Sequence, residues 1–341
     1  MKKTNLIICR TLFTVFVTCI FSVTFLSCSD NDEDISIADE YDEGNFGVPL
    51  YDAYAAKYEI VEEGSKYKSI ELTESGNYII TTLDNGGSYS PIRMVNDTSS
   101  SVLSFLVMPH WGSTRSTQRG FPETIVAYGY ISGNYTVIDE NTFHLEGFGT
   151  LEVTKYSQDD FYSLVIIPEN GIGSIRLKSS MPNRIYNSWK SRQLCRTWDL
   201  INFRFYYIVD GYTLINVEGR TYEEMAENLK NWAEKNDPEY DGESPILELE
   251  GSPRQIIFTM TGTYAVLYSG NSMAVSTWSW AREDQGIIAY SWDNIYDGDS
   301  YDGNVVVRFK GDKAYVIEAE GENDGLVSDE MGLEITMQEA K

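Results

Sequence analysis

Hydrophobic and polar residues alternate with a period of two along most of the chain from residue 66 onward, in short segments separated by Gly, Asn and Asp. This pattern is typical of antiparallel sheet with one face packed on a core. The clearest hairpins are residues 69–73 with 78–83, residues 142–146 with 150–153, and residues 304–309 with 314–318. The sequence therefore predicts an all-β protein.

Helical periodicity is confined to two segments. Residues 221–236 carry apolar side chains three and four positions apart, begin at a Thr followed by two Glu, and end before Asp-Pro. They predict one amphipathic helix lying on a sheet. Residues 49–60 predict a second helix, because Tyr51, Tyr54 and Tyr58 would share one face.

One pattern occurs twice in the chain. Residues 72–80 (LTESGNYII) and 258–266 (FTMTGTYAV) both read apolar-Thr-x-x-Gly-x-Tyr-apolar-apolar. Farther along, residues 133–137 (GNYTV) and 277–280 (TWSW) are expected to be corresponding strands. The two halves are therefore predicted to repeat one unit, with the boundary in the polar connection near residues 183–188.

The N-terminus has the anatomy of a signal peptide over residues 1–27. A positive start at Lys2, Lys3 and Arg10 precedes an uncharged apolar run too short for a membrane span. The run ends FLSC, which resembles a bacterial lipobox with Cys28 as the lipidated residue. A diacylglyceryl group there would anchor the chain to a membrane. The alternative is an ordinary secretory leader that ends by chance in Cys.

Residues 28–45 are acidic and contain too little apolar matter to fold, so a disordered tether is predicted. An acidic run directly behind a lipidated Cys resembles the surface-export signal of Bacteroidota lipoproteins. That resemblance implies an outer-membrane protein facing the cell surface, whereas a plain linker would leave it facing the periplasm. The remaining chain divides into β-modules over residues 46–185 and 186–341.

The amino-acid composition argues against several classes of partner and site. Asp and Glu number 52 against 26 Lys and Arg, a net charge of -26, which argues against nucleic acid or anionic lipid surfaces as partners. Hydrophobic residues at 42% can form a sizeable core, so the acidity lies on a folded surface. Only 2 His and 4 Cys give little basis for a metal site or a disulfide framework. Cys195 is the one thiol expected in the mature chain, and no cofactor is expected.

The second module resembles the lipocalin-like domains of Bacteroidota lipoproteins. The resemblance rests on residues 194–200 (LCRTWDL), 258–264 (FTMTGTY) and 278–280 (WSW), with Arg196 where the family has Gly. It covers roughly residues 190–341, and residues 46–185 are a diverged copy. It implies an antiparallel lipocalin-like barrel or half-open sheet in two modules with one or two short helices, sometimes with an apolar calyx. The family has no common known reaction or ligand.

Aromatic side chains are the main ligand-lining candidates. They would face the interior because alternate residues of a barrel strand point inward. The candidates are Tyr264, Tyr268, Trp278, Trp280 and Trp292. Alternatively they simply fill a small barrel, or present a sugar-stacking surface if some rings face outward.

The sequence contains only weak patterns for catalytic or metal-binding residues. Asp297, Asp299 and Asp302 offer the oxygens that calcium needs, but position twelve counted from Asp297 is Arg308 rather than Glu, so a solvated Asp-Gly turn is favoured. No nucleophile or carboxylate pair lies in a recognisable catalytic context, and a glycoside hydrolase-like enzyme is the remaining alternative.

The sequence thus predicts a lipid-anchored, non-catalytic outer-membrane lipoprotein, attached to the membrane by its N-terminus. Its β-modules would bind a small apolar or sugar-like ligand or an envelope protein. The alternative is a structural or protein-interaction lipoprotein whose barrel interiors are filled with side chains.

Overall fold

The computed structural model describes residues 56–82, 125–127, 129–156, 161–171, 173–180, 186–238, 240, 252–269, 273–293, 300–323 and 328–340. The predicted signal peptide and tether, including Cys28, lie outside these residues.

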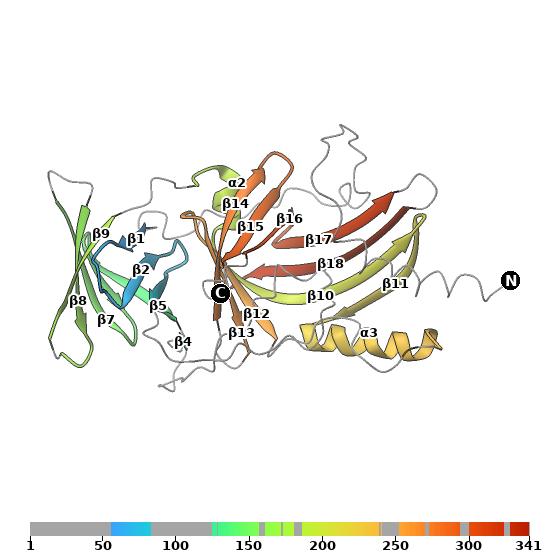
Figure 1. Cartoon of the computed structure of the whole chain (residues 1–341), viewed down its shortest axis with the longest axis horizontal. Coiled ribbons are helices and arrows are strands. Elements are labelled where there is room, and N and C mark those ends of the chain that lie inside the picture. The colour runs from blue at the N-terminus through green and yellow to red at the C-terminus, as the bar shows by residue number, and fades with distance from the viewer. Residues whose placement is uncertain are drawn as a thin grey trace.

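The N-terminal half forms a closed antiparallel barrel, here called barrel 1 (Figure 1). Each of its eight strands pairs with the next, and β9 pairs with β1 to close the ring. The strands are β1 (Ala56–Ile60), β2 (Tyr67–Leu72), β3 (Asn77–Thr82), β5 (Tyr130–Asp139), β6 (Thr142–Leu145), β7 (Gly149–Lys155), β8 (Phe161–Pro168) and β9 (Ile175–Ser180). A short strand, β4 (Ile125–Ala127), pairs with β5.

The C-terminal half forms a second closed barrel, barrel 2, in which β10 pairs with β18. Its eight strands are β10 (Thr197–Val209), β12 (Pro253–Phe258), β13 (Thr263–Tyr268), β14 (Met273–Arg282), β15 (Ile287–Asp293), β16 (Ser300–Lys310), β17 (Lys313–Asn323) and β18 (Ser328–Glu339). An added strand, β11 (Tyr212–Gly219), pairs with the second half of β10. The all-β, two-barrel prediction is confirmed, and both sheets are closed rather than half-open.

The described residues contain two helices. Helix α3 (Tyr222–Asn236) matches the predicted amphipathic helix, begins behind a Thr221 cap and packs on β10 and β11. Helix α2 (Trp189–Leu194) precedes barrel 2 and was not predicted. Neither helix in the described part of the chain has the length and apolar character needed to span a bilayer.

The predicted helix at residues 49–60 is wrong for its described part. Residues 56–60 form strand β1, which pairs with β2 on one side and β9 on the other. Ala56 and Tyr58 are buried in barrel 1, whereas Lys57 and Glu59 between and after them are not. Barrel closure therefore overrides the helical spacing of the tyrosines. Residues 49–55 lie outside the described residues.

The repeated sequence forms the same turn in both barrels. Thr73 N donates to Asn77 O at 2.8 Å between β2 and β3, and Thr259 N donates to Thr263 O at 2.9 Å between β12 and β13. In both turns a Gly takes the left-handed conformation, with φ 79° at Gly76. An aromatic residue of the following strand locks each turn.

The locking bonds are equivalent. The Tyr135 hydroxyl donates to Thr73 O at 3.0 Å, and the Trp278 indole N–H donates to Thr259 O at 3.0 Å. Because Tyr135 and Trp278 lie on β5 and β14, the strands expected to correspond occupy the same place in their barrels.

Side chains fill the interiors of both barrels. In barrel 2 the rings of Phe258, Tyr264 and Trp278 pack together, with Phe258 5.8 Å from each of the other two centroids. In barrel 1, Tyr78 and Leu145 are fully buried. The described core is thus packed protein rather than a channel.

The barrels join through an apolar patch with a polar margin. Ile79 of β3 packs with a cluster on the outer face of barrel 2: Ile257, Ala265, Leu267 and Met273. At the margin, Thr197 Oγ1 donates to Asn77 Oδ1 at 2.8 Å, and Lys57 Nζ donates to Thr263 Oγ1 at 2.9 Å. The outer face of β12–β14 therefore lies against barrel 1.

Candidate functional site

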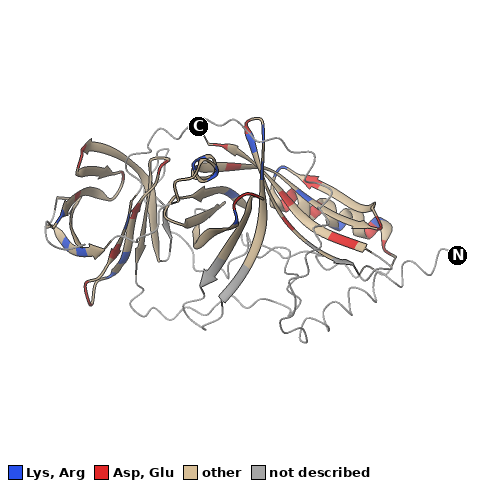
Figure 2. Cartoon of the chain, turned by 90° about the horizontal axis from the view of Figure 1, so that it is seen from above, with Lys and Arg blue, Asp and Glu red and all other residues tan. Residues whose placement is uncertain are grey.

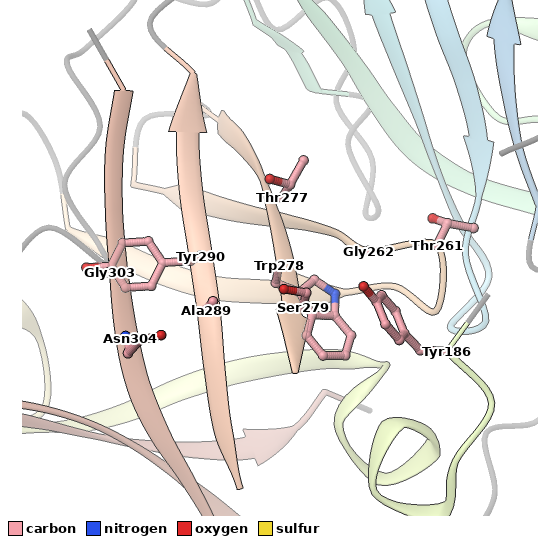
Figure 3. Close-up of a pocket in the computed structure, with 10 residues that line it drawn as sticks. All are labelled: Tyr186, Thr261, Gly262, Thr277, Trp278, Ser279, Ala289, Tyr290, Gly303 and Asn304. Atoms are coloured by element: carbon pink, nitrogen blue, oxygen red, sulfur yellow. The ribbon is translucent and has the colours of Figure 1, made fainter. Parts of the chain in front are cut away.

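A hollow of about 610 Å³ lies at the wall of barrel 2 (Figure 3). It is formed by the segment before α2, the β12–β13 turn and the middles of β14, β15 and β16. The described lining residues are Tyr186, Thr261, Gly262, Thr277, Trp278, Ser279, Ala289, Tyr290, Gly303 and Asn304. The volume falls in the range of small-molecule sites.

Strand alternation places the polar lining residues outward. Trp278 is 3% exposed and belongs to the barrel core, so Thr277 and Ser279 on either side of it point to the outer face. On β16, Val305 packs inside, so its neighbour Asn304 points outward. The hollow therefore has hydroxyl and amide groups over a floor of strand backbone.

Tyr186 forms an aromatic wall of the hollow (Figure 3). Its backbone N–H donates to Met260 O at 2.7 Å, which fixes the segment against the β12–β13 turn. Its ring centroid lies 5.0 Å from that of Trp278. Tyr186 thus has a defined position although it comes from outside the barrel strands.

Barrel 1 supports another wall. The Thr261 hydroxyl donates to the Glu71 carboxylate of β2, and Figure 3 shows Thr261 at the side nearest the strands of barrel 1. Glu71 is only 2% exposed. The position of one lining hydroxyl is therefore set by a buried carboxylate of the other barrel.

The hollow contrasts with the rest of the surface in charge. Its described lining residues are all uncharged, although the chain carries a net charge of -26. Figure 2 shows Asp and Glu distributed over both barrels. A smaller hollow of about 440 Å³ on barrel 1 includes Glu152 and Lys155. The hollow on barrel 2 is therefore the better candidate for a neutral ligand.

Buried ionisable groups lie beside the hollow, at the junction of the barrels. Glu74 of barrel 1 is fully buried, and its Oε1 accepts a hydrogen bond from Met260 N at 2.9 Å. Burial, reinforced by Glu74, raises the pKa of the Cys195 thiol well above its ordinary value. The thiol is therefore protonated and unreactive at neutral pH.

Arg196 lies where the motif of the lipocalin-like domains has Gly, and its side chain is held by contacts with barrel 2 and helix α2. Its side chain is 2% exposed, forms an ion pair with Glu339 at 3.0 Å and donates to Arg192 O at 3.0 Å. Burial lowers its pKa, and Glu339 opposes that shift. The guanidinium also lies 5.6 Å from the Trp198 ring.

Most of the predicted aromatic candidates face the core. Tyr264, Tyr268 and Trp278 are at most 4% exposed, and Trp278 also borders the hollow. Trp280 is partly buried and donates its indole N–H to Ser191 Oγ of α2 at 2.8 Å. Trp292 lies in β15, but its side chain is outside the described part. Their role in ligand binding stays a prediction.

The other predicted sites are not described. Cys28, Asp297 and Asp299 lie outside the described residues, as does the side chain of Asp302 in β16. Lipidation and calcium binding stay predictions. Within the described residues, no group of three His, Cys, Asp or Glu is placed to hold a metal ion.

Five polar lining residues were not predicted from the sequence: Tyr186, Thr261, Thr277, Ser279 and Asn304. A usable signal existed for Thr277 and Ser279, because they flank an inward Trp and must point outward if that strand is in a barrel. Tyr186, Thr261 and Asn304 carry no such signal, because their neighbours in the hollow depend on strand pairing and on how the two barrels pack together.

No protein-family model matches the chain, and no curated protein matches it. Among solved structures, it is similar to a mutant of the vaccine antigen transferrin binding protein B from Haemophilus parasuis Hp5, at 7% identity and a TM-score of 0.20. The match covers 82% of this chain and 62% of that one, so the chain spans less than two thirds of its neighbour. So weak a likeness says nothing about function. The fold and the hollow define the class: a two-barrel, all-β protein with an uncharged, polar hollow at barrel 2.

Proposed function

We propose that this protein is a lipid-anchored, non-catalytic outer-membrane protein that binds a small ligand in the hollow on barrel 2. The observation that carries the proposal is this uncharged, hydroxyl-rich hollow on a strongly acidic protein whose barrel interiors are filled. The FLSC motif and the acidic stretch behind it support the anchor and the outward orientation.

The lining chemistry favours binding over catalysis. The described lining residues offer hydroxyl, amide and phenol groups but no carboxylate, imidazole or thiol. General acid-base catalysis needs a group of one of those kinds in contact with the substrate, and Glu71, which accepts from Thr261, is not itself among the described lining residues. Cys195, close to the junction, is fully buried.

The binding proposal is tested on the full mature chain purified from its own membranes. Native mass spectrometry should show a bound small mass that is lost on unfolding. The double variant Thr277→Val/Asn304→Ala should lose it, whereas Thr136→Val should keep it, because Thr136 is exposed on the corresponding strand β5 of barrel 1. A bound mass that survives the double variant would place the ligand elsewhere.

The anchor is tested separately. Cys28→Ala should move the protein from the membrane fraction to the soluble fraction, because the acyl chains supply the membrane affinity. Protease added to intact cells should degrade the wild type if it faces outward. Equal fractionation of wild type and variant would refute lipidation at Cys28.

A second candidate is a structural or protein-interaction lipoprotein, favoured by the filled barrel interiors. It predicts that crosslinking in cells captures a specific envelope protein while the purified chain carries no small mass. Capture that is unaffected by Thr277→Val/Asn304→Ala would favour this candidate over the hollow.

A further inference from the structure

We infer that the hollow on barrel 2 binds a neutral carbohydrate, and that Glu71 of barrel 1 positions one of the hydroxyls that recognise it. This inference rests on the proposed function, because it names the ligand class of the same site. It follows from the hydrogen-bonding character of the lining, the aromatic wall and the Glu71–Thr261 contact.

The polar lining groups match hydroxyl ligands. Thr277, Ser279, Asn304 and the Tyr186 phenol can each both donate and accept hydrogen bonds. Sugar hydroxyls have the same dual character, whereas an anion requires donors and a metal cation requires acceptors. With no charged residue among the described lining, the hollow offers no strong pairing for an ion.

The walls add an apolar component of limited extent. The Tyr186 ring is partly exposed and lies beside Trp278. Ala289 and Gly262 also line the hollow, but both residues are small and add little apolar surface. The C–H face of a pyranose ring packs well on an aromatic ring of this kind. A lipid chain would instead cover the Ser279 hydroxyl without bonding it, which is unfavourable.

Glu71 determines whether the Thr261 hydroxyl donates or accepts hydrogen bonds. A carboxylate accepts hydrogen bonds, so the Thr261 hydroxyl donates its proton to Glu71. Its oxygen can then only accept, and the Thr259 hydroxyl, 2.9 Å away, takes one of its two acceptor positions. A ligand group that meets Thr261 must therefore donate, as a sugar hydroxyl does. Since Glu71 is buried between the barrels, it is a positioning residue, and the site is complete only when both barrels are present.

The ligand class is tested by calorimetric titration of the full mature chain. The probes are the neutral trisaccharides maltotriose, cellotriose and mannotriose, with trigalacturonate and palmitate as charged and apolar comparisons. At least one neutral trisaccharide should bind saturably. Asn304→Ala or Thr277→Val should weaken that binding by about tenfold, the effect of losing one hydrogen bond, and Thr136→Val should leave it unchanged.

The outcomes separate the two proposals. If palmitate or trigalacturonate binds and the hollow variants weaken it, while no neutral trisaccharide binds, the carbohydrate inference is wrong and the hollow remains a binding site. If a trisaccharide binds but the hollow variants leave its affinity unchanged, the proposed location is wrong. If none of the probes binds, the carbohydrate inference is overturned.

The role of Glu71 is tested by a conservative pair of variants. Glu71→Ala should weaken trisaccharide binding by about tenfold, as Thr261→Val should, and Glu71→Gln should restore most of it because its amide oxygen can accept from Thr261. Thermal unfolding of each variant is measured alongside. If Glu71→Ala lowers the unfolding temperature but leaves affinity unchanged, Glu71 is structural only.

Discussion

At the residue scale, a tyrosine ring lies over a glycine of the neighbouring strand in both barrels. Tyr78 is paired with Gly133 in barrel 1, and Tyr290 is paired with Gly303 in barrel 2. A Cβ added at Gly133 would lie 2.9 Å from Tyr78 Cε1. Such pairs let a large ring pack flat inside a closed barrel, because the opposite position has no side chain.

Gly133→Ala should therefore destabilise the protein by about 1–3 kcal/mol through overpacking against Tyr78. Urea unfolding measures the change. In a Tyr78→Leu background, where the ring is absent, the same substitution should have a clearly smaller effect. Equal effects in both backgrounds would show that the ring is not what excludes a side chain at residue 133.

Buried tyrosines also make stability depend on pH. Burial, with a contribution from Tyr162, raises the pKa of Tyr58 from 10.0 to about 12. Between these two values the unfolded chain loses the Tyr58 proton while the folded chain retains it, so unfolding is increasingly favoured as pH rises. Burial raises the pKa of Tyr206, Tyr222 and Tyr264 in the same direction.

Tyr58→Phe should remove part of this alkaline loss, up to about 3 kcal/mol, the equivalent of a two-unit pKa difference. The free energy of unfolding in urea is measured at several pH values from neutral to strongly alkaline. The two proteins should diverge only above the pKa of an unfolded tyrosine. Parallel pH profiles for wild type and Tyr58→Phe would contradict the assignment.

At the element scale, α3 packs against β10 and β11 of barrel 2. The Thr221 hydroxyl accepts a hydrogen bond from Glu224 N at 3.2 Å, and Leu229 is 2% exposed in the core. Thr221→Ala should destabilise by about 1 kcal/mol and Leu229→Ala by about 2–5 kcal/mol. The exposed Glu227→Ala should change stability by less than about 0.5 kcal/mol. If Leu229→Ala has no more effect than Glu227→Ala, α3 does not stabilise the barrel.

The elements that could be predicted from the sequence are those whose signals are local. Helix α3 has its cap, its apolar spacing and its stop within residues 221–238, and the three predicted hairpins have turns between adjacent strands. Strand β1 was assigned wrongly because one of its partners, β9, is more than a hundred residues away. The spacing of Tyr51, Tyr54 and Tyr58 carries no information about that pairing.

At the scale of the whole molecule, the candidate site depends on how the strands and barrels come together. Thr277 and Ser279 could be placed on the outer face from the inward position of Trp278. Tyr186 and Thr261 reach the same hollow only because the segment before α2 bonds to Met260 and Glu71 of barrel 1 bonds to Thr261. Those contacts join distant parts of the chain, so no local pattern reports them.

The same junction predicts how the protein unfolds. Ile79 lies on the outer side of β3, between the inward residues Tyr78 and Ile80, yet it is only 1% exposed because it packs with Ile257 and its neighbours on barrel 2. An apolar patch of this kind couples two barrels more strongly than a polar contact between domains does. The wild type should therefore unfold in a single calorimetric transition.

Ile79→Ser should uncouple the barrels and split that transition into two, because a hydroxyl without a partner would face the apolar patch of barrel 2. Ile138→Ser is the matched control, since Ile138 lies on β5 of barrel 1 and is 59% exposed. If the wild type already unfolds in two transitions, or if both variants keep one, the patch does not couple the barrels. Uncoupling should also move Glu71 away from Thr261, so trisaccharide affinity should fall in Ile79→Ser and stay unchanged in Ile138→Ser.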